Sequence, residues 1–317
     1  MKVIVLGATG FLGRHIVANL LEHGHDVTGF SRNDSNDAVL RELGVRPVRG
    51  NLEDLDSIPA LLEGQEAVIM AAQLMLDDEK RLAEKIVDTL EGSNRTFIFS
   101  SGTSLMSIPT GGLWDERSFA EDEPFVPKRQ IAPRLINEAV VRDAAAKGVR
   151  GMVIRPSLIW GNGGSQIIAD FYHSARTTGA VCHIGRGLNV YSNIHVEELA
   201  EIYRLAMERG TAGALYFAVS GEVAYGVIAK TIAAHLGVPT KSVTVDEACE
   251  IWDKGLGKIV LQSNSRQRCP RTRNELGWSP REDRVDILED CIHPAYAQAT
   301  ERAQPSWVAK KPEQATA

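Results

Sequence analysis

Apolar residues occur along this chain in two arrangements, short continuous runs and repeats at helical spacing. Residues 3–6 form a continuous apolar run, which is typical of a parallel strand buried on both faces. Residues 16–21 instead place their apolar side chains on one face of a helix. Three glycines lie between the run and the repeat: Gly7, Gly10 and Gly13. The pattern therefore predicts a strand, a glycine turn and a helix at the start of the chain.

The same alternation continues through the first half of the chain. Further strands are predicted at 25–30, 46–51, 66–73, 95–101 and 151–156. The helices predicted between them lie at about 38–43, 55–62, 78–90 and 136–147. Strands that alternate with helices at this spacing predict an α/β fold, namely a Rossmann-type doubly wound parallel sheet.

The second half is less regular, and its pattern predicts a smaller part of α+β character. Helices are expected at about 167–177, 196–208 and 227–236, and strands at 189–194 and 214–219. We expect residues 1–165 to form mainly the doubly wound domain, residues 166–300 mainly a second part, and residues 301–317 a loose tail. No obvious linker separates the two halves, so strands of the second part are expected to return to the first.

Composition and charge exclude several classes of protein. The 317 residues carry a formal net charge of −6, so no basic face favours nucleic acid as a partner. No apolar run reaches the roughly 18 residues that a membrane span needs, and the first residues lack the features of a signal peptide. We therefore expect a cytoplasmic protein with no membrane partner. The four cysteines are scattered without metal-ligand spacing, so no metal site is expected.

Ligands of doubly wound sheets bind beyond the carboxyl ends of the strands. This rule places six segments on one rim: 7–13, 31–32, 51, 71–73, 100–103 and 156–157. Within the first segment, Gly7 can form a tight turn, Gly10 lets the backbone approach a pyrophosphate, and Gly13 lets helix and strand pack closely. The N–H groups and dipole of the following helix also favour an anion. The rim therefore predicts a dinucleotide site.

The end of the second predicted strand bears on the form of the dinucleotide. An acidic residue there would bind the ribose 2′-hydroxyl of NAD and repel the 2′-phosphate of NADP. The strand ends instead at Ser31 and Arg32, a hydroxyl donor followed by a planar cation suited to phosphate. We therefore expect NADP. NAD stays the alternative, for the case that Arg32 is only a solvated loop charge.

Six motifs together resemble the extended and atypical short-chain dehydrogenase/reductase superfamily, of the NAD-dependent epimerase/dehydratase type. They begin at Gly7 (GATGFLG), Gly50 (GNL), Phe99 (FSS), Arg155 (RPSLIWG), Ile194 (IHVEELA) and Leu276 (LGWSP). The resemblance covers residues 2–280 and implies that residues 1–165 bind NAD(P) while residues 166–300 close over a small-molecule substrate. It also implies a homodimer formed through the helices at 78–90 and 136–147.

The rim rule, the strand ends and the resemblance together give a set of expected cofactor-binding residues. It comprises Gly7, Thr9, Gly10, Phe11, Leu12, Gly13, Ser31, Arg32, Asn51, Leu52, Ala71, Ala72, Gln73, Ser100, Arg134, Pro156, Ser157 and Leu158.

The resemblance fails at the superfamily's usual catalytic pair, a tyrosine and a lysine four residues later. Aligning Glu138 with an acidic position that is frequent in the family places Gln130 and Arg134 at these two sites. A glutamine amide exchanges no proton near neutral pH, and an arginine stays charged. The family's serine or threonine aligns with Gly102, between Ser101 and Thr103. The usual proton transfer is therefore not available unchanged.

Three functions remain open at this point. The first is an NADP-dependent oxidoreductase in which Ser101, Thr103 and Arg134 polarise the carbonyl of a small molecule. The second is a redox-neutral epimerase, dehydratase or isomerase with acid–base groups drawn from the C-terminal part. Its candidate groups are His195, Tyr191, Tyr225, Asp115 and Glu116. The third is a regulator that binds NADP and catalyses nothing.

Two features also have structural interpretations. His195 precedes a predicted helix and suits a role at the start of that helix as well as acid–base chemistry. A basic run suits an anionic substrate, a neighbouring subunit or a solvated face. Its members are Arg266, Arg268, Arg271 and Arg273.

Overall fold

The computed structural model describes residues 1–298, and its largest element is a seven-stranded parallel sheet. The strand order is β11-β7-β5-β4-β1-β2-β3. The strands span Lys2–Leu6 (β1), Asp26–Ser31 (β2), Arg46–Arg49 (β3), Ala67–Met70 (β4), Thr96–Ser100 (β5), Arg150–Pro156 (β7) and Leu215–Ala218 (β11). The predicted doubly wound α/β fold is confirmed. The tail expected at 301–317 lies outside the described residues.

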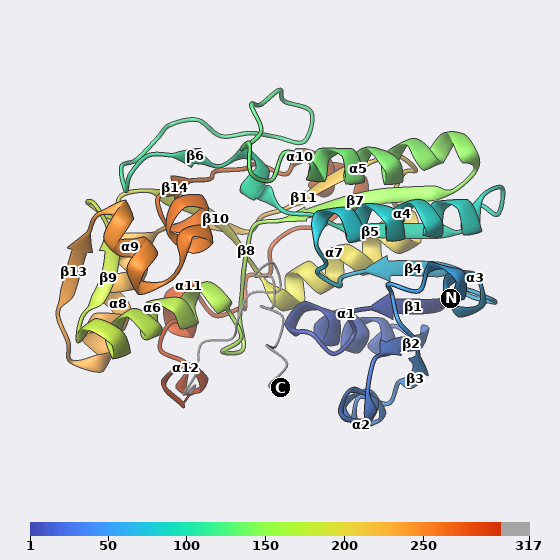
Figure 1. Cartoon of the computed structure of the whole chain (residues 1–317), viewed down its shortest axis with the longest axis horizontal. Helices are drawn as coiled ribbons and strands as arrows, with labels where there is room; N and C mark the ends of the chain where they lie inside the picture. The colour runs from blue at the N-terminus through green and yellow to red at the C-terminus, as the bar shows by residue number, and fades with distance from the viewer. Residues whose placement is uncertain (299–317) are drawn as a thin grey trace, which may run out of the picture.

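Helices cover both faces of this sheet (Figure 1). They span Phe11–Glu22 (α1), Asp34–Glu42 (α2), Ile58–Leu61 (α3), Leu76–Leu90 (α4), Arg134–Asp143 (α5) and Val196–Arg209 (α7). α1 packs against α7, and α4 packs against α5. α2 begins earlier than the expected position 38, because the side chain of Asn33 caps it by accepting the Asn36 N–H at 2.9 Å.

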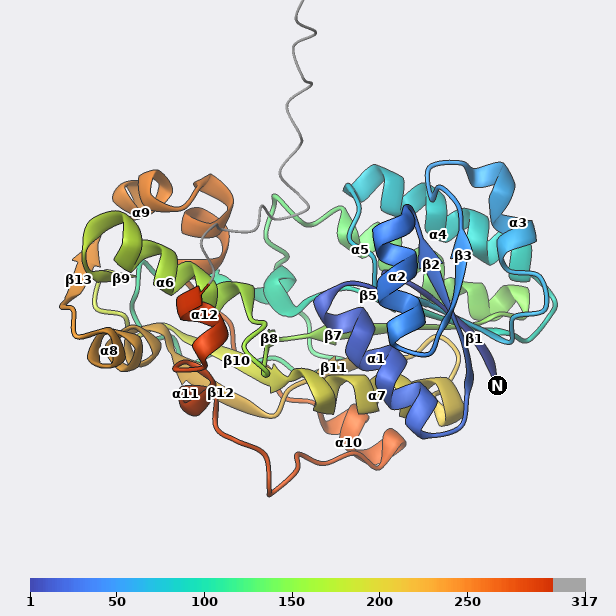
Figure 2. The same ribbon diagram turned by 90° about the horizontal axis from the view of Figure 1, so that it is seen from below.

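The second lobe is built from several short elements beside the large sheet (Figure 2). Its strands are β8 (Leu158–Trp160), β10 (Val190–His195), β12 (Gly221–Ala224), β9 (Val181–Ile184) and β13 (Thr240–Val243). Its helices include α6 (Gln166–Thr178), α8 (Tyr225–Leu236) and α9 (Val245–Ile251). The pair β6 (Ile108–Pro109) and β14 (Ser263–Asn264) is antiparallel. A π-helix at Leu256–Leu261 directly precedes β14. The sequence pattern did not predict β8, β9, β12, β13 or α9, because segments this short show little periodicity.

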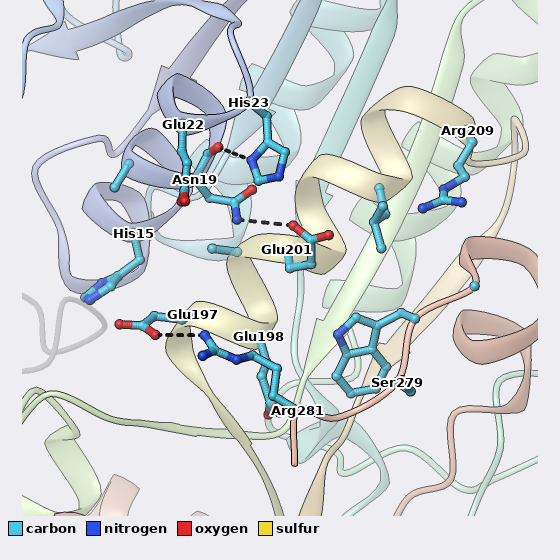
Figure 3. Close-up of a pocket in the computed structure, with 15 residues that line it drawn as sticks. His15, Asn19, Glu22, His23, Glu197, Glu198, Glu201, Arg209, Ser279 and Arg281 are labelled. Atoms are coloured by element: carbon cyan, nitrogen blue, oxygen red, sulfur yellow. Dashed lines mark hydrogen bonds and ion pairs between the residues drawn. The ribbon is translucent and has the colours of Figure 1, made fainter. Parts of the chain in front are cut away.

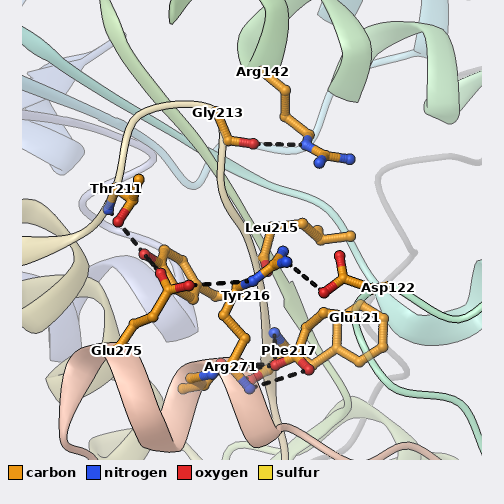
Figure 4. Close-up of polar contacts among 11 residues, drawn as sticks. Glu121, Asp122, Arg142, Thr211, Gly213, Leu215, Tyr216, Phe217, Arg271 and Glu275 are labelled. Atoms are coloured by element: carbon orange, nitrogen blue, oxygen red, sulfur yellow. Dashed lines mark hydrogen bonds and ion pairs between the residues drawn. The ribbon is translucent and has the colours of Figure 1, made fainter.

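Strand β11 returns from the second half of the chain to the edge of the large sheet, where side chains satisfy its free backbone groups (Figure 4). The hydroxyl of Thr272 donates to the Phe217 carbonyl at 2.6 Å, and Arg271 donates to the Leu215 carbonyl at 3.3 Å. Buried Glu121 accepts the Phe217 N–H at 3.5 Å. These contacts protect an edge that could otherwise pair with another chain.

Most of the basic run forms ion pairs. Arg266 binds Glu222 at 3.0 Å, and Arg271 binds Asp122 at 2.5 Å. Arg268 forms an ion pair with Glu123. The pairs of Arg268 and Arg271 hold the loop before α5 against α10 (Pro270–Leu276) and the residues just before it, whereas Arg266 binds β12. The sequence pattern did not predict α10.

Three further observations concern the described residues. None of their helices is both long enough and apolar enough to cross a membrane. Residues 1–298 contain no group of three or more His, Cys, Asp and Glu side chains able to hold a metal ion. All four cysteines are free thiols.

Candidate functional site

The glycine turn lies directly after β1, at the carboxyl edge of the sheet. Gly7 has a φ of +94°, and a Cβ atom there would lie 2.7 Å from the backbone nitrogen of Ala72. A Cβ atom on Gly13 would lie 2.0 Å from the Gly7 carbonyl oxygen. Both positions therefore require glycine, because the turn, the start of α1 and the segment after β4 are in direct contact.

The first turn of α1 leaves backbone donors open. Gly10 is exposed and caps the helix without a side-chain hydrogen bond, and the first helical bond runs from the Arg14 N–H to the Gly10 carbonyl at 3.0 Å. The N–H groups of residues 11–13 therefore have no partner within the helix. Such a terminus fits the pyrophosphate of a dinucleotide.

The end of β2 presents an exposed cation. Ser31 is fully buried, and its hydroxyl donates to the Asn33 carbonyl at 3.0 Å. Arg32 is exposed, and no hydrogen bond or ion pair of its guanidinium is formed within residues 1–298. The two carboxylates that follow, Asp34 and Asp37, both bind Arg49. Both carboxylates are thus paired with Arg49 and not with Arg32, and the bond to Arg49 lowers the pKa of Asp37.

The other expected cofactor residues lie around the same edge. Ala71 joins the turn by donating its N–H to the Leu6 carbonyl at 2.9 Å. The exposed residues are Asn51 and Gln73, and the partly buried ones are Thr9, Phe11, Leu12, Ala71, Ala72 and Ser100. The buried ones are Leu52, Pro156, Ser157 and Leu158. The hydroxyl of Ser157, directly after β7, donates a hydrogen bond to the Ala218 carbonyl of β11 at 2.8 Å. Ser157 therefore connects the ends of these two strands.

Ser101, which follows β5, has its hydroxyl committed to a buried ion pair. It donates to Glu138, and Arg155 binds the same carboxylate from Nε at 2.8 Å. Both charged side chains are 3% exposed. The rings of Phe125 and Phe217 flank Arg155, with their centroids 5.2 and 5.5 Å from its guanidinium carbon. The network ties β5, α5 and β7 together.

Arg134, at the start of α5, is held in a second ion pair. Its guanidinium binds Glu79 of α4 at 3.1 Å, and Asn137 donates to the other oxygen of that carboxylate at 3.0 Å. Burial raises the pKa of Glu79, while Arg134 and Asn137 act in the opposite direction. Gln130, which aligns with the missing tyrosine, is exposed. Sequence reasoning missed Glu79, because it lies 55 positions from Arg134 and in a different element.

Thr103 meets a tyrosine from the second lobe. It is 1% exposed in a short 3-10 helix after β5, and side-chain hydrogen bonds join it and Ser265 to the hydroxyl of Tyr191 on β10. The ring of Tyr191 stacks on Tyr225, with centroids 5.6 Å apart and planes at 22°. Burial raises the pKa of Tyr191 to about 12, so this phenol is neutral at physiological pH.

Lys128 is a partly buried cation that sequence reasoning missed. Its ammonium donates to the Ser107 hydroxyl at 3.0 Å, the Ser263 hydroxyl at 2.7 Å and the Ile259 carbonyl at 2.6 Å. All three acceptors are neutral, and burial lowers the pKa of Lys128 to about 8. No local pattern marks this residue, because its partners come from two distant segments.

Two acid–base candidates have other partners. His195 is the N-cap of α7, where its ring accepts the Glu197 N–H at 3.3 Å. The centroid of this ring lies 4.8 Å from that of the Trp160 ring. Burial lowers its pKa. Asp115 binds Arg117 at 2.7 Å, and this contact lowers the pKa of Asp115.

A separate cavity of about 580 Å³ lies along α1, α7 and the segment 277–281 (Figure 3). Its polar groups bind one another: Asn19 donates to Glu201 at 3.2 Å, and Arg281 lies 3.7 Å from Glu197. None of the residues that line it belongs to the expected cofactor or catalytic sets.

Comparisons with known proteins agree with this fold and show the family. The model of the NAD dependent epimerase/dehydratase family matches residues 3–217. An uncharacterized protein of Schizosaccharomyces pombe is 32% identical over 306 residues, which cover 93% of this chain and 100% of the relative. The 2-alkyl-3-oxoalkanoate reductase of Stenotrophomonas maltophilia is 30% identical over 243 residues, 70% of this chain and 71% of the reductase.

Solved structures share the fold at low sequence identity. The dTDP-glucose 4,6-dehydratase of Bacillus anthracis in complex with NAD superposes with a TM-score of 0.72 at 15% identity, over 94% of this chain and 96% of that chain. The corresponding enzyme of Streptomyces venezuelae with bound NAD has a TM-score of 0.73 at 17% identity, with the same coverage of both chains.

Proposed function

Because the chain belongs to the NAD-dependent epimerase/dehydratase family, we propose that it is an NADP-dependent oxidoreductase acting on a carbonyl or hydroxyl group of a small molecule. Family membership gives the general type, an NAD(P)-dependent oxidoreductase or epimerase. The NADP preference and the carbonyl chemistry are the further steps of the proposal.

The exposed guanidinium of Arg32 carries the proposal. It follows β2 at the edge that holds the glycine turn, and the nearby acids Asp34 and Asp37 are bound to Arg49. An exposed cation whose nearby acids pair with another arginine favours the 2′-phosphate of NADP over the free ribose of NAD. The glycine turn would hold the pyrophosphate, and Asn51 and Gln73 are exposed at the same edge.

The residues proposed for catalysis differ in how their side chains are engaged. A bound nicotinamide would supply or accept the hydride. In the proposal, the protein orients and polarises the substrate carbonyl through Thr103, Ser101 and Arg134. Thr103 is bonded to the neutral hydroxyl of Tyr191, whereas Ser101 and Arg134 contact the carboxylates of Glu138 and Glu79. Thr103 is therefore the best placed of the three to polarise a neutral carbonyl.

Calorimetric titration with NADPH and NADH tests the cofactor assignment. Arg32→Ala should weaken NADPH binding by about 1.5–3 kcal/mol, the scale of a charge-assisted hydrogen bond, and leave NADH unchanged. Arg41→Ala is the matched control, since it removes a positive charge from α2 that already pairs with Asp37 at 3.7 Å. Equal effects of Arg32→Ala on both cofactors, or no effect on either, would contradict the assignment.

A non-catalytic NADP-binding protein is the second candidate, favoured by the engagement of Ser101 and Arg134 with carboxylates. The two functions are separated by incubating the protein with NADPH and a panel of small ketones. NADPH oxidation supports the oxidoreductase. Binding without turnover supports the second candidate, and product formation without NADPH consumption indicates a redox-neutral enzyme.

The proposal also covers the oligomeric state, the location and the ligand class. We propose a homodimer formed through α4 and α5, a cytoplasmic location and a small-molecule substrate as the ligand. Sedimentation of the full chain tests the dimer.

A further inference from the structure

The hydroxyl of Tyr225 is buried and is not bound by any side chain or backbone group of residues 1–298. The side chain is 1% exposed, and its hydroxyl has no hydrogen-bond partner within the described part of the chain. An unpaired buried hydroxyl destabilises a folded protein, and most such groups are satisfied in native structures. An exception is expected where a ligand supplies the missing hydrogen bond.

Tyr225 belongs to a group that we call the hydroxyl cluster, which consists of Thr103, Tyr191, Tyr225 and Ser265. Tyr191 is central, because its ring stacks on Tyr225 and its hydroxyl bonds to Thr103 and Ser265. The two phenols also influence each other, since Tyr191 contributes to the raised pKa of Tyr225, of which burial is the main cause. Every member is neutral while both phenols keep their protons.

The cluster lies where the second lobe joins the carboxyl edge of the large sheet. β8 begins at Leu158, two residues after the end of β7, and pairs with β10, which contains Tyr191. Thr103 follows the end of β5, and β5 pairs with β7. Figures 1 and 2 show β8 and β10 on the side of the second lobe that faces the large sheet. Ligands of doubly wound sheets bind at this edge.

We propose that the hydroxyl cluster binds the uncharged carbonyl or hydroxyl oxygen of the substrate, an inference that rests on the proposed function. Tyr225 supplies the unpaired hydroxyl, its ring stacks on Tyr191, and the hydroxyl of Tyr191 in turn bonds to Thr103. The ring of Phe171, whose centroid lies 5.9 Å from that of Tyr225, makes the surroundings of this tyrosine apolar. A carboxylate or phosphate would lose its hydration among neutral groups, so the ligand class is a small neutral ketone or alcohol with an apolar body.

Titration with acetophenone and benzoate tests this class, because the two probes share a ring and differ in charge. The wild-type chain should bind acetophenone and bind benzoate at least about tenfold more weakly. Tyr225→Phe removes only the free hydroxyl and should weaken acetophenone about tenfold. Absence of acetophenone binding to the wild type, preference for benzoate, or an unchanged affinity in Tyr225→Phe would each overturn the inference.

Tyr172→Phe is the matched control. Tyr172 is a buried tyrosine of the same lobe, but its hydroxyl already donates to the Cys291 carbonyl at 2.8 Å. Tyr172→Phe should therefore lower the unfolding temperature and leave acetophenone binding unchanged. Tyr225→Phe should unfold at the wild-type temperature or above it. A loss of thermal stability equal to that of Tyr172→Phe would show that Tyr225 has a partner within the protein and would overturn the inference.

NADPH binding to the same proteins separates this inference from the proposed function. Tyr225→Phe should bind NADPH as tightly as the wild type does. If the wild type binds acetophenone but not NADPH, the proposed function fails and the hydroxyl cluster stands. If it binds NADPH but not acetophenone, the inference about the hydroxyl cluster fails and the cofactor assignment of the proposed function stands.

Discussion

The cofactor edge and the catalytic side of the candidate site are adjacent, but their polar groups are engaged very differently. At the cofactor edge, the first N–H groups of α1 are open and Arg32 is exposed. On the catalytic side, Ser101 contacts Glu138, and Arg134 contacts Glu79. The first region is organised to receive an anion. In the second, two of the expected catalytic groups already have carboxylate partners, and the neutral hydroxyls around Tyr191 are the groups without such partners.

The strongest test of this difference is to break the buried ion pair on the catalytic side. Arg155→Leu leaves the Glu138 carboxylate buried without its cation, which should cost about 3–5 kcal/mol of unfolding free energy. Urea denaturation measures this loss, and the double variant Glu138→Leu with Arg155→Leu should recover most of it. NADPH affinity should stay unchanged. A stable Arg155→Leu protein that no longer binds NADPH would assign the pair to the cofactor edge instead.

The glycine turn gives the next largest effect. A Cβ atom at position 13 would lie 2.0 Å from the Gly7 carbonyl oxygen, so Gly13→Ala must push α1 away from β1. We expect a loss of about 1–3 kcal/mol in unfolding free energy and weaker NADPH binding, since overpacking displaces the turn. Gly102→Ala is the control on the catalytic side, because the nearest atom to its Cβ would be 3.8 Å away. Equal NADPH affinities in the two variants would contradict a special role for the turn.

The smallest effect concerns Lys128, whose ammonium is buried among neutral acceptors. Burial lowers its pKa from 10.5 to about 8, so the unfolded chain holds this proton more tightly than the folded protein. The cost of burying the charge is therefore present below pH 8 and is relieved as the pH rises from 8 to 10.5. After allowance for the partial exposure of Lys128, we expect this relief to be on the order of 1 kcal/mol.

Urea denaturation across this pH range measures the effect as a difference between proteins. The stability of the wild type relative to Lys128→Met should rise with pH, because the variant lacks the titrating amine. If the unfolding free energies of the two proteins change with pH in parallel, the charge of Lys128 costs no stability in the folded protein.

The sequence by itself determined the features that depend on near neighbours. The apolar run 3–6 became the buried strand β1, and Gly13 packs on Gly7 six positions earlier, so both could be predicted from near neighbours. The close approach of Gly7 to Ala72, in contrast, is a long-range contact that only the structure showed. The alternation of strands and helices likewise predicted the parallel sheet, whose strand ends bring Ser31 and Arg32 to the same edge as the turn.

Only the tertiary structure decided which groups of the candidate site are free. Glu138 lies 37 positions from Ser101, and Glu79 lies 55 positions from Arg134, so no local pattern could pair them. Tyr191 reaches Thr103 only because β8 joins the second lobe to β7 and pairs with β10. Residue types and spacing describe what a side chain can bind, whereas its actual partner depends on long-range packing. That packing paired Ser101 and Arg134 with carboxylates.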